Sequence, residues 1–316
     1  MKTIKILTGM LFTVLFGSCE TEVVHNHHIN LDGLDKEMTF VTASLSECPS
    51  RTVLVDKTNG NGKTLLWSKG DKIRVSDGVT EAVYTTDADA QAVAEFTNAK
   101  AGLSGSAVQY TAFYPETFSS SNLTLPAVQQ YVKDGMAGFP MMALSSTREL
   151  SFRNLCGVIC LRIKTNGGAD VKLAKIVLES PGNGLSGKFT LDGYKAIVSN
   201  KDADLTLECW DDVTVSDASY TDFYLYLPDG QYTTMYLTLA GMDGSEVRFK
   251  SCGTISVTRS AVTAIPLVLD TMHFNGSLED LPVVDDGTGF EEIVSVTDVA
   301  DGVFPVCADN VDYSTR

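Results

Sequence analysis

The chain has 316 residues, a formal net charge of −16 and an apolar fraction of 44%. This length allows one large domain or two of ordinary size, and the apolar fraction is sufficient for a sizeable core. The negative charge argues against binding to nucleic acid and against electrostatic attachment to anionic lipid, because both require a basic surface.

The first residues have the pattern of an export signal. Lys2 and Lys5 give a positive start, and the apolar run from Ile4 to Phe16 is shorter than the ~20 residues that a membrane-spanning helix needs. Phe16-Gly-Ser-Cys19 resembles the lipobox of bacterial lipoproteins, in which the cysteine is lipidated and becomes the mature N-terminus. We therefore predict a lipoprotein signal peptide over 1–18 and lipidation of Cys19. The alternative is an ordinary secretory signal with an incidental cysteine.

Residues 19–37 are polar and are interpreted as a tether between the lipid and the fold. They contain the cluster His25-Asn-His27-His28. No cysteine or carboxylate stands at ligand spacing from these histidines, so we predict no metal site.

The pattern between Met38 and Leu269 is that of short strands separated by turn residues such as Pro228-Asp-Gly230. Only Ala88–Phe96 would tolerate a helix. Short strands at this spacing favour antiparallel sandwiches over βαβ units. A domain boundary is expected near Arg148. The candidate strands are 38–44, 64–67, 72–75, 108–114, 122–126, 129–132, 150–164, 175–179, 187–191, 205–209, 223–227, 233–239, 246–251 and 262–269.

The run 150–164 is the most informative of these strands. Leu155, Ile159 and Leu161 fall on one face, while the other face passes from Val158 to Arg162 and so from apolar to charged. Because side chains alternate along a strand, this pattern predicts a strand that begins buried on both sides and ends at the surface.

The residues that carry most enzyme chemistry are absent from the body of the chain. No histidine occurs between Ile29 and Met272, so nucleophilic triads and most general-base arrangements lack their usual base. We predict that the protein is not an enzyme and binds no cofactor. The six cysteines after Cys19 do not have the spacing of a disulfide framework, so buried thiols are expected, with a Cys209–Cys252 pair left open.

The order of several motifs resembles the fimbrillin (Mfa-like, type V pilin) family of surface proteins. No single motif is specific, but they follow one another in order from about Met38 to Leu269. The matching segments are Ser50-Arg51-Thr52, Leu66-Trp67-Ser-Lys-Gly70-Asp71-Lys-Ile73, Tyr110-Thr-Ala-Phe-Tyr114-Pro115, Leu125-Pro126 with Gln129-Gln-Tyr131, Phe139-Pro140-Met-Met, Leu150-Ser-Phe152-Arg-Asn-Leu155-Cys-Gly157-Val-Ile159, Leu185-Ser-Gly187 and Phe223-Tyr-Leu-Tyr-Leu227-Pro228.

The resemblance implies an all-β fold of two tandem transthyretin-like β-sandwich domains, over 38–148 and 149–270, exported as an outer-membrane lipoprotein. It also implies assembly into fimbriae by donor-strand exchange. In such pilins a protease removes the N-terminal segment after an arginine, and the vacated groove accepts a strand from the next subunit. Arg51 is the matching position, so Thr52 would begin the processed chain. The alternative is that Arg51 is a turn residue without processing.

The acidic extension 271–316 departs from the family pattern. It either supplies a strand to its own fold or to a neighbour, or it is a loose tail. Taken together, the sequence predicts a fimbrial subunit or fimbria-associated surface lipoprotein that contacts other fimbrial subunits and adheres to a host or bacterial surface. The alternative is a surface glycan-binding lipoprotein of a nutrient-uptake system, with sugars stacking on Trp67 or Trp210, although core packing is the favoured role of both tryptophans.

Overall fold

The computed structural model describes residues 37–45, 55–56, 63–64, 66–100, 102–133, 135–166, 170–244, 246–251, 253–270 and 290–292. Every regular element in these ranges is a β-strand, as the sequence predicts. The described residues include no helix of the length and hydropathy that crossing a membrane requires. Cys19, Arg51 and Thr52 lie outside the described residues, as do the signal peptide and most of the acidic extension.

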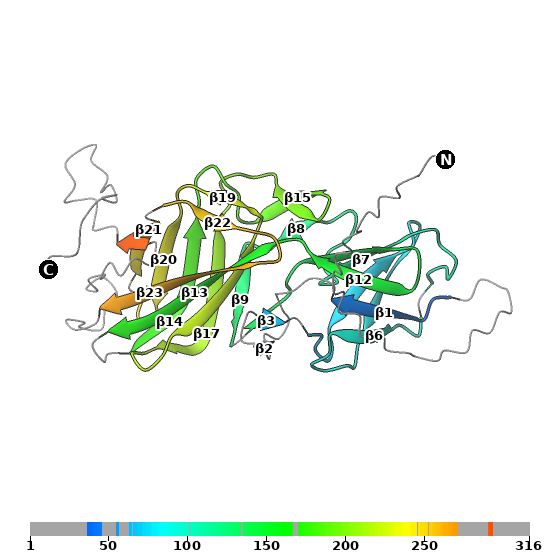
Figure 1. Ribbon diagram of the computed structural model, residues 1–316, viewed down its shortest axis with the longest axis horizontal. Helices are drawn as coiled ribbons and strands as arrows, with labels where there is room; N and C mark the ends of the chain where they lie inside the picture. Colours follow the sequence, from blue (N-terminus) through cyan, green and yellow to red (C-terminus); the bar gives the residue numbers. More distant parts are fainter. Residues whose placement is uncertain are drawn as a thin grey trace, which may run out of the picture. The chain divides into compact units, whose positions relative to one another are not determined.

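Seven strands form one sheet that closes into a barrel (Figure 1). The sequence predicts a sandwich here. Trp67 is fully buried in the interior, in edge-to-face contact with the rings of Phe96, Tyr114 and Phe152 at 5.0–5.4 Å. In sheet order the strands are β1 (Phe40–Leu45), β12 (Glu149–Asn154), β11 (Met141–Ser145), β7 (Tyr110–Tyr114), β4 (Lys72–Ser76), β5 (Glu81–Thr85) and β6 (Val93–Thr97). The sheet closes because β6 pairs with β1 along residues 40–44 and with β5 through the single pair Thr85–Thr97.

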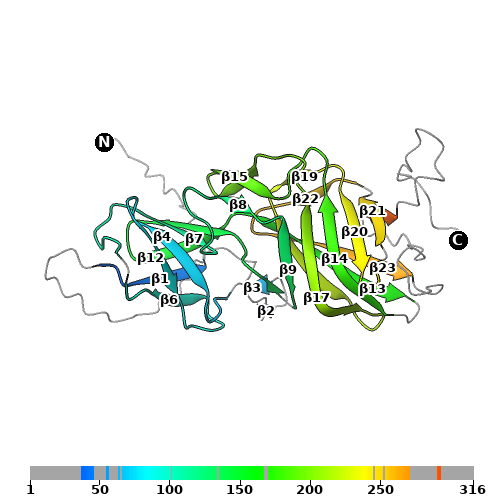
Figure 2. The same ribbon diagram turned by 180° about the vertical axis from the view of Figure 1, so that it is seen from behind.

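Two further sheets pack face to face as a sandwich (Figure 2). Their inward side chains, such as Ile176, Leu207 and Leu225, form one core cluster, as alternation along half-buried strands requires. The larger sheet contains β10 (Gly135–Met136), β9 (Val128–Val132), β17 (Leu205–Val215), β14 (Val171–Glu179), β20 (Tyr236–Gly241), β21 (Glu246–Ser251) and β24 (Phe290–Glu292). The smaller sheet contains β18 (Thr221–Leu227), β13 (Gly157–Asn166) and β23 (Val262–Asp270).

The remaining strands form small ribbons beside these sheets. They are β8 (Thr124–Leu125), β15 (Gly187–Asp192) and β16 (Lys195–Val198) in one ribbon, β19 (Gly230–Tyr232) and β22 (Ile255–Val257) in a second, and β2 (Val55–Asp56) and β3 (Lys63–Thr64) in a third. Within the acidic extension, β24 pairs antiparallel with β21 of the same chain. Of the alternatives open for the extension, these residues therefore supply a strand to their own fold.

The run 150–164, expected to be one strand, is divided between the barrel and the sandwich. β12 pairs with β1 and β11 in the barrel, although it lies beyond the boundary expected near Arg148. The chain then turns at Leu155 and Cys156 and continues as β13 in the sandwich. β9 and β10 precede β12 in the chain but belong to the sandwich, so no single cut in the sequence separates the sheets.

The two faces of β13 belong to two different cores. Ile159, Leu161 and Ile163 point into the sandwich core, whereas Val158 and Cys160 belong to the cluster that fills the barrel. The strand is buried on both sides as far as Leu161 and then exposes Arg162, as the sequence predicts.

The side chain of Gln129 pairs with β18, the edge strand of the smaller sheet. Its side-chain amide donates to the carbonyl oxygen of Tyr226 at 2.7 Å and accepts from the Tyr226 N–H at 3.1 Å. A carboxamide carries both a donor and an acceptor, so it can pair with a strand edge as a backbone peptide would. Gln129 thereby satisfies part of the edge of β18.

Candidate functional site

β1 is the first described strand of the chain and is held on both sides. It pairs antiparallel with β6, with Val41 opposite Phe96, and parallel with β12, with Ala43 opposite Leu150. Thus it is an interior strand of the barrel sheet, and its removal would leave the backbone groups of β6 and β12 without their partners.

The inward face of β1 is apolar and completely buried. Val41 and Ala43 have no solvent exposure, and neither does Met38, which precedes the strand. The ring nitrogen of Trp67 donates a hydrogen bond to the carbonyl oxygen of Ala43 at 3.1 Å. The largest fully buried side chain of the barrel core is therefore also bonded to the backbone of β1.

The residues before β1 are also anchored. The amide of Met38 donates to the Leu103 carbonyl oxygen at 3.0 Å, and the Asn98 amide donates to the Thr39 carbonyl oxygen at 2.9 Å. The hydroxyl of Tyr84 donates to the carbonyl oxygen of Met38. Burial raises the pKa of Tyr84 to about 12, so this hydroxyl stays protonated at physiological pH.

Exchange of β1 for a strand of another chain would require a cleavage position after β1 and a groove that can hold the new strand. Arg51, the predicted processing position, follows β1 in the sequence and is itself outside the described residues. Cleavage there would break the covalent link between β1 and the rest of the barrel. The position that β1 occupies offers two strand edges and an apolar floor, which an extended segment of another chain could fill.

The two tryptophans lie in opposite environments. Trp67 is fully buried, as the favoured core role predicts, so its ring cannot serve as a stacking surface for sugars. Trp210 on β17 is 67% exposed, and the core role expected for it is wrong. The reason is the sheet face: Leu207 and Cys209 point into the sandwich core, and Trp210 falls on the opposite face of the strand.

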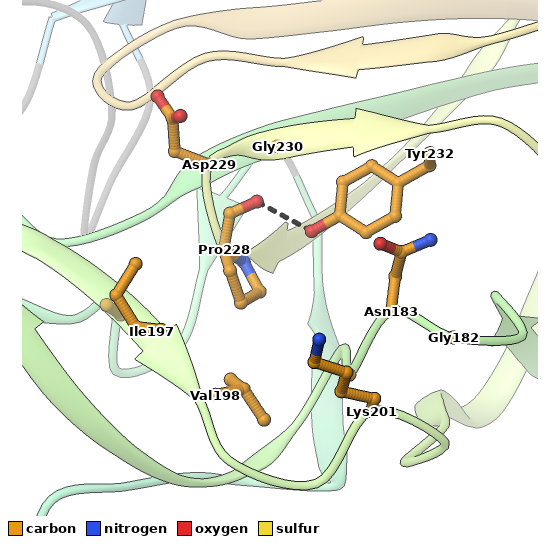
Figure 3. Close-up of a pocket in the computed structure, with 11 residues that line it drawn as sticks. Gly182, Asn183, Ile197, Val198, Lys201, Pro228, Asp229, Gly230 and Tyr232 are labelled. Carbon is orange, nitrogen blue, oxygen red and sulfur yellow. Dashed lines mark hydrogen bonds between the residues drawn. The ribbon is translucent and has the colours of Figure 1, made fainter.

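A pocket of about 160 Å³ lies where β16, the loop around Asn183 and the turn before β19 meet (Figure 3). Its walls are the aliphatic side chains of Ile197 and Val198, with Lys201 pointing toward the space between them and Asn183. The hydroxyl of Tyr232, which is buried, donates to the Pro228 carbonyl oxygen at 2.7 Å. The volume suits one small group rather than a cofactor.

The carboxylate beside this pocket is already paired. Asp229 accepts hydrogen bonds from the Lys195 ammonium at 2.7 Å and from the Arg259 amide at 2.8 Å. Partial burial alone would raise the pKa of Asp229, but these two donors outweigh it and hold the pKa below its ordinary value. Nowhere in the described part of the chain do three metal-ligating side chains come together.

Three of the cysteines are buried thiols: Cys156, Cys160 and Cys209. Burial raises the pKa of Cys209 to about 12, so this thiol is not a nucleophile at physiological pH. Because Cys209 is a thiol, its pairing with Cys252, which lies outside the described residues, is not supported.

The sequence does not indicate two of these features. The pocket joins Asn183, Lys201 and Tyr232, which are far apart in the chain and stand beside ordinary turn residues. Gln129 is part of a motif that the sequence singles out, but its pairing with the distant Tyr226 depends on the folded sandwich.

The described fold defines an all-β protein whose first described strand belongs to a closed barrel, with two further sheets that form a sandwich. No protein-family model matches the chain, and no curated protein matches it. Among solved structures, a candidate cell adhesion protein from Bacteroides ovatus is similar, with 12% sequence identity and a TM-score of 0.47. The match covers 83% of this chain and 99% of that chain. A candidate cell adhesion protein from Bacteroides fragilis has 10% identity, coverage of 82% and 99%, and a TM-score of 0.44.

The tip fimbrial protein Mfa3 from Porphyromonas gingivalis, with a C-terminal truncation, is also similar, with 9% identity, coverage of 80% and 97%, and a TM-score of 0.31. These neighbours are fimbrial and adhesion proteins, the kind of protein that the motif order in the sequence resembles. At such identities and TM-scores the names describe the neighbours, and the function of this chain rests on its own residues.

Proposed function

We propose that the protein is a fimbrial subunit or fimbria-associated surface lipoprotein that assembles by donor-strand exchange and contributes to adhesion. The observation that carries the proposal is the position of β1. It is an interior strand of the barrel, it lies on the N-terminal side of Arg51, and its inward side chains fill the core beside Trp67.

The physical properties of this groove support strand exchange. After cleavage between Arg51 and Thr52, β1 would be held only by noncovalent contacts. A strand from another subunit that presents apolar residues at alternate positions could pair with β6 and β12 and restore the same core. The incoming strand would replace the buried area of β1, so the exchange would cost little free energy.

Lipidation at Cys19 places the chain at the outer membrane before assembly. The acyl chains would supply the anchoring that a net charge of −16 cannot supply at an anionic membrane surface. Processing after Arg51 would release the chain from this anchor together with β1, so one cleavage would couple release to assembly.

Intact-mass measurement on the outer-membrane fraction and on isolated fimbriae tests this proposal. We expect a lipidated species that begins at Cys19 in the membrane and a species that begins at Thr52 in the fibres. Fibres containing chains that still carry residues 19–51 would contradict exchange at the β1 position. Unchanged surface fibres and unchanged adhesion after deletion of the gene would contradict the fimbrial role itself.

A further inference from the structure

The outward face of the larger sheet carries an exposed aromatic residue within a polar surround. Trp210 is 67% exposed on β17, and Val128 and Val132 on the adjacent strand β9 are 45% and 38% exposed. β9 and β17 run parallel, with Glu208 beside Gln130, and Figure 2 shows the two strands side by side. We call the five outward residues Val128, Gln130, Val132, Glu208 and Trp210 the Trp210 face.

Hydrogen bonds order the polar side chains of the Trp210 face. The ring nitrogen of Trp210 donates to the side-chain oxygen of Gln130, and the Gln130 amide donates to the Glu208 carboxylate at 3.1 Å. The indole is therefore oriented by its edge, and its exposed surface is not consumed by this contact. Gln130 keeps one amide N–H, and Glu208 keeps acceptor capacity, close to the ring.

We propose that the Trp210 face binds a neutral oligosaccharide. A sugar ring has a face of C–H groups, which packs on an indole, and a rim of hydroxyl groups, which both donate and accept hydrogen bonds. The Trp210 face offers both kinds of contact: an aromatic surface flanked by a carboxamide and a carboxylate. The carboxylate and the net charge of −16 favour a neutral glycan over a sialylated or sulfated one.

The other occupants fit this surface less well. An anionic membrane or a nucleic acid would be repelled by the same charge. A stable protein interface needs roughly 800 Å² from each partner with an apolar centre, whereas here one tryptophan and two half-exposed valines surround Gln130 and Glu208. A donated strand would add to a sheet edge, and Trp210 projects from a sheet face. The site is separate from β1, so its function does not depend on strand exchange.

The chain contains two tryptophans, and this allows a direct test. The protein is applied to an array of neutral hexose oligosaccharides with their sialylated and sulfated counterparts, and the strongest neutral binder is titrated while intrinsic fluorescence is recorded. Since Trp67 is fully buried, we expect the emission change to come from Trp210 and to disappear in Trp210→Phe. We expect Trp210→Ala to weaken binding at least about tenfold.

Met242→Ala is the matched control, because Met242 is also a large exposed apolar side chain, 55% exposed, but lies in the turn after β20, where its amide donates to the Lys172 carbonyl oxygen, and is not part of the Trp210 face. It should bind within about twofold of the unaltered protein. The proposal is overturned if no neutral glycan binds, if only acidic glycans bind, or if Trp210→Ala binds as tightly as the unaltered protein. Self-association that Trp210→Ala abolishes, measured by sedimentation velocity, would instead assign the face to a second copy of the chain.

Discussion

The structure makes a quantitative prediction about the strand that would be exchanged. If the folded chain is cleaved after Arg51, a synthetic peptide spanning residues 37–50 should compete with β1 for the groove between β6 and β12. Val41 is fully buried in that groove, whereas Thr42 points away from the core and is partly exposed. Peptides carrying Val41→Ala and Thr42→Ser therefore test the inward and outward faces of one strand.

The expected difference follows from the buried volume. Val41→Ala removes two buried carbon groups at about 0.8 kcal/mol each, and the cavity left behind adds to this, which gives about 2 kcal/mol. Because 1.4 kcal/mol corresponds to a factor of ten, the altered peptide should bind about 30-fold more weakly than the unaltered one. Thr42→Ser removes one partly exposed methyl group, and its affinity should stay within about threefold.

Fluorescence anisotropy of a labelled 37–50 peptide on the cleaved protein measures both affinities. Two results would refute the reasoning. One is a Val41→Ala peptide that binds as well as the unaltered peptide, because peptide affinity would then not depend on the inward side chains. The other is a cleaved protein that never takes up the peptide over days, because β1 would then be a permanent part of the barrel.

Three further predictions concern stability. Trp67→Ala should lower the free energy of unfolding in urea by about 3–5 kcal/mol, because it leaves a large cavity and removes the indole hydrogen bond to the Ala43 carbonyl oxygen. Trp210→Ala should change the free energy of unfolding by less than about 0.5 kcal/mol. Asp229→Asn should be less stable than the unaltered protein at pH 7. The pKa of Asp229 is lower in the folded state than the unfolded value of about 4. The ionised carboxylate therefore stabilises the fold above a pH of about 4, and this stabilisation is lost as the pH falls through the pKa of the folded state. The urea midpoints of Asp229→Asn and the unaltered protein should therefore converge in acid. Gly157→Ala should lower the free energy of unfolding by about 1–3 kcal/mol, because an added Cβ would overlap the Thr258 carbonyl oxygen. Gly253→Ala is the control in thermal unfolding, because no atom lies within 4 Å of the Cβ that it would add.

Alternation along strands is a local property, and the sequence predicts it well. The change from apolar to charged residues between Val158 and Arg162 correctly indicates where β13 reaches the surface. The break before β13 is set by a distant segment: the backbone of Thr258 approaches Gly157 so closely that no side chain fits. A glycine in a strand pattern signals such an approach without naming the partner.

The same distinction explains the two tryptophans. Both stand in strand-like segments, and the sequence cannot show which face of each strand a second layer will cover. Trp67 enters a barrel that closes around it, whereas Trp210 lies on the outer face of the sandwich. The processing site at Arg51 and the lipidation site at Cys19 remain predictions of the sequence, because both lie outside the described residues.

The double-sided burial of β13 would have a mechanical consequence if the chain carried tension within a fibre, as the proposed fimbrial role implies. Val158 and Cys160 belong to the hydrophobic cluster that includes the barrel core, and Ile159 and Leu161 belong to the sandwich core, so this one strand contributes side chains to both clusters. A pull along β13 would be shared with β18 and β23, which pair with β13 on its two sides. In such a fibre, β13 would therefore pass a load through two strand ladders and two hydrophobic clusters instead of through a single covalent connection.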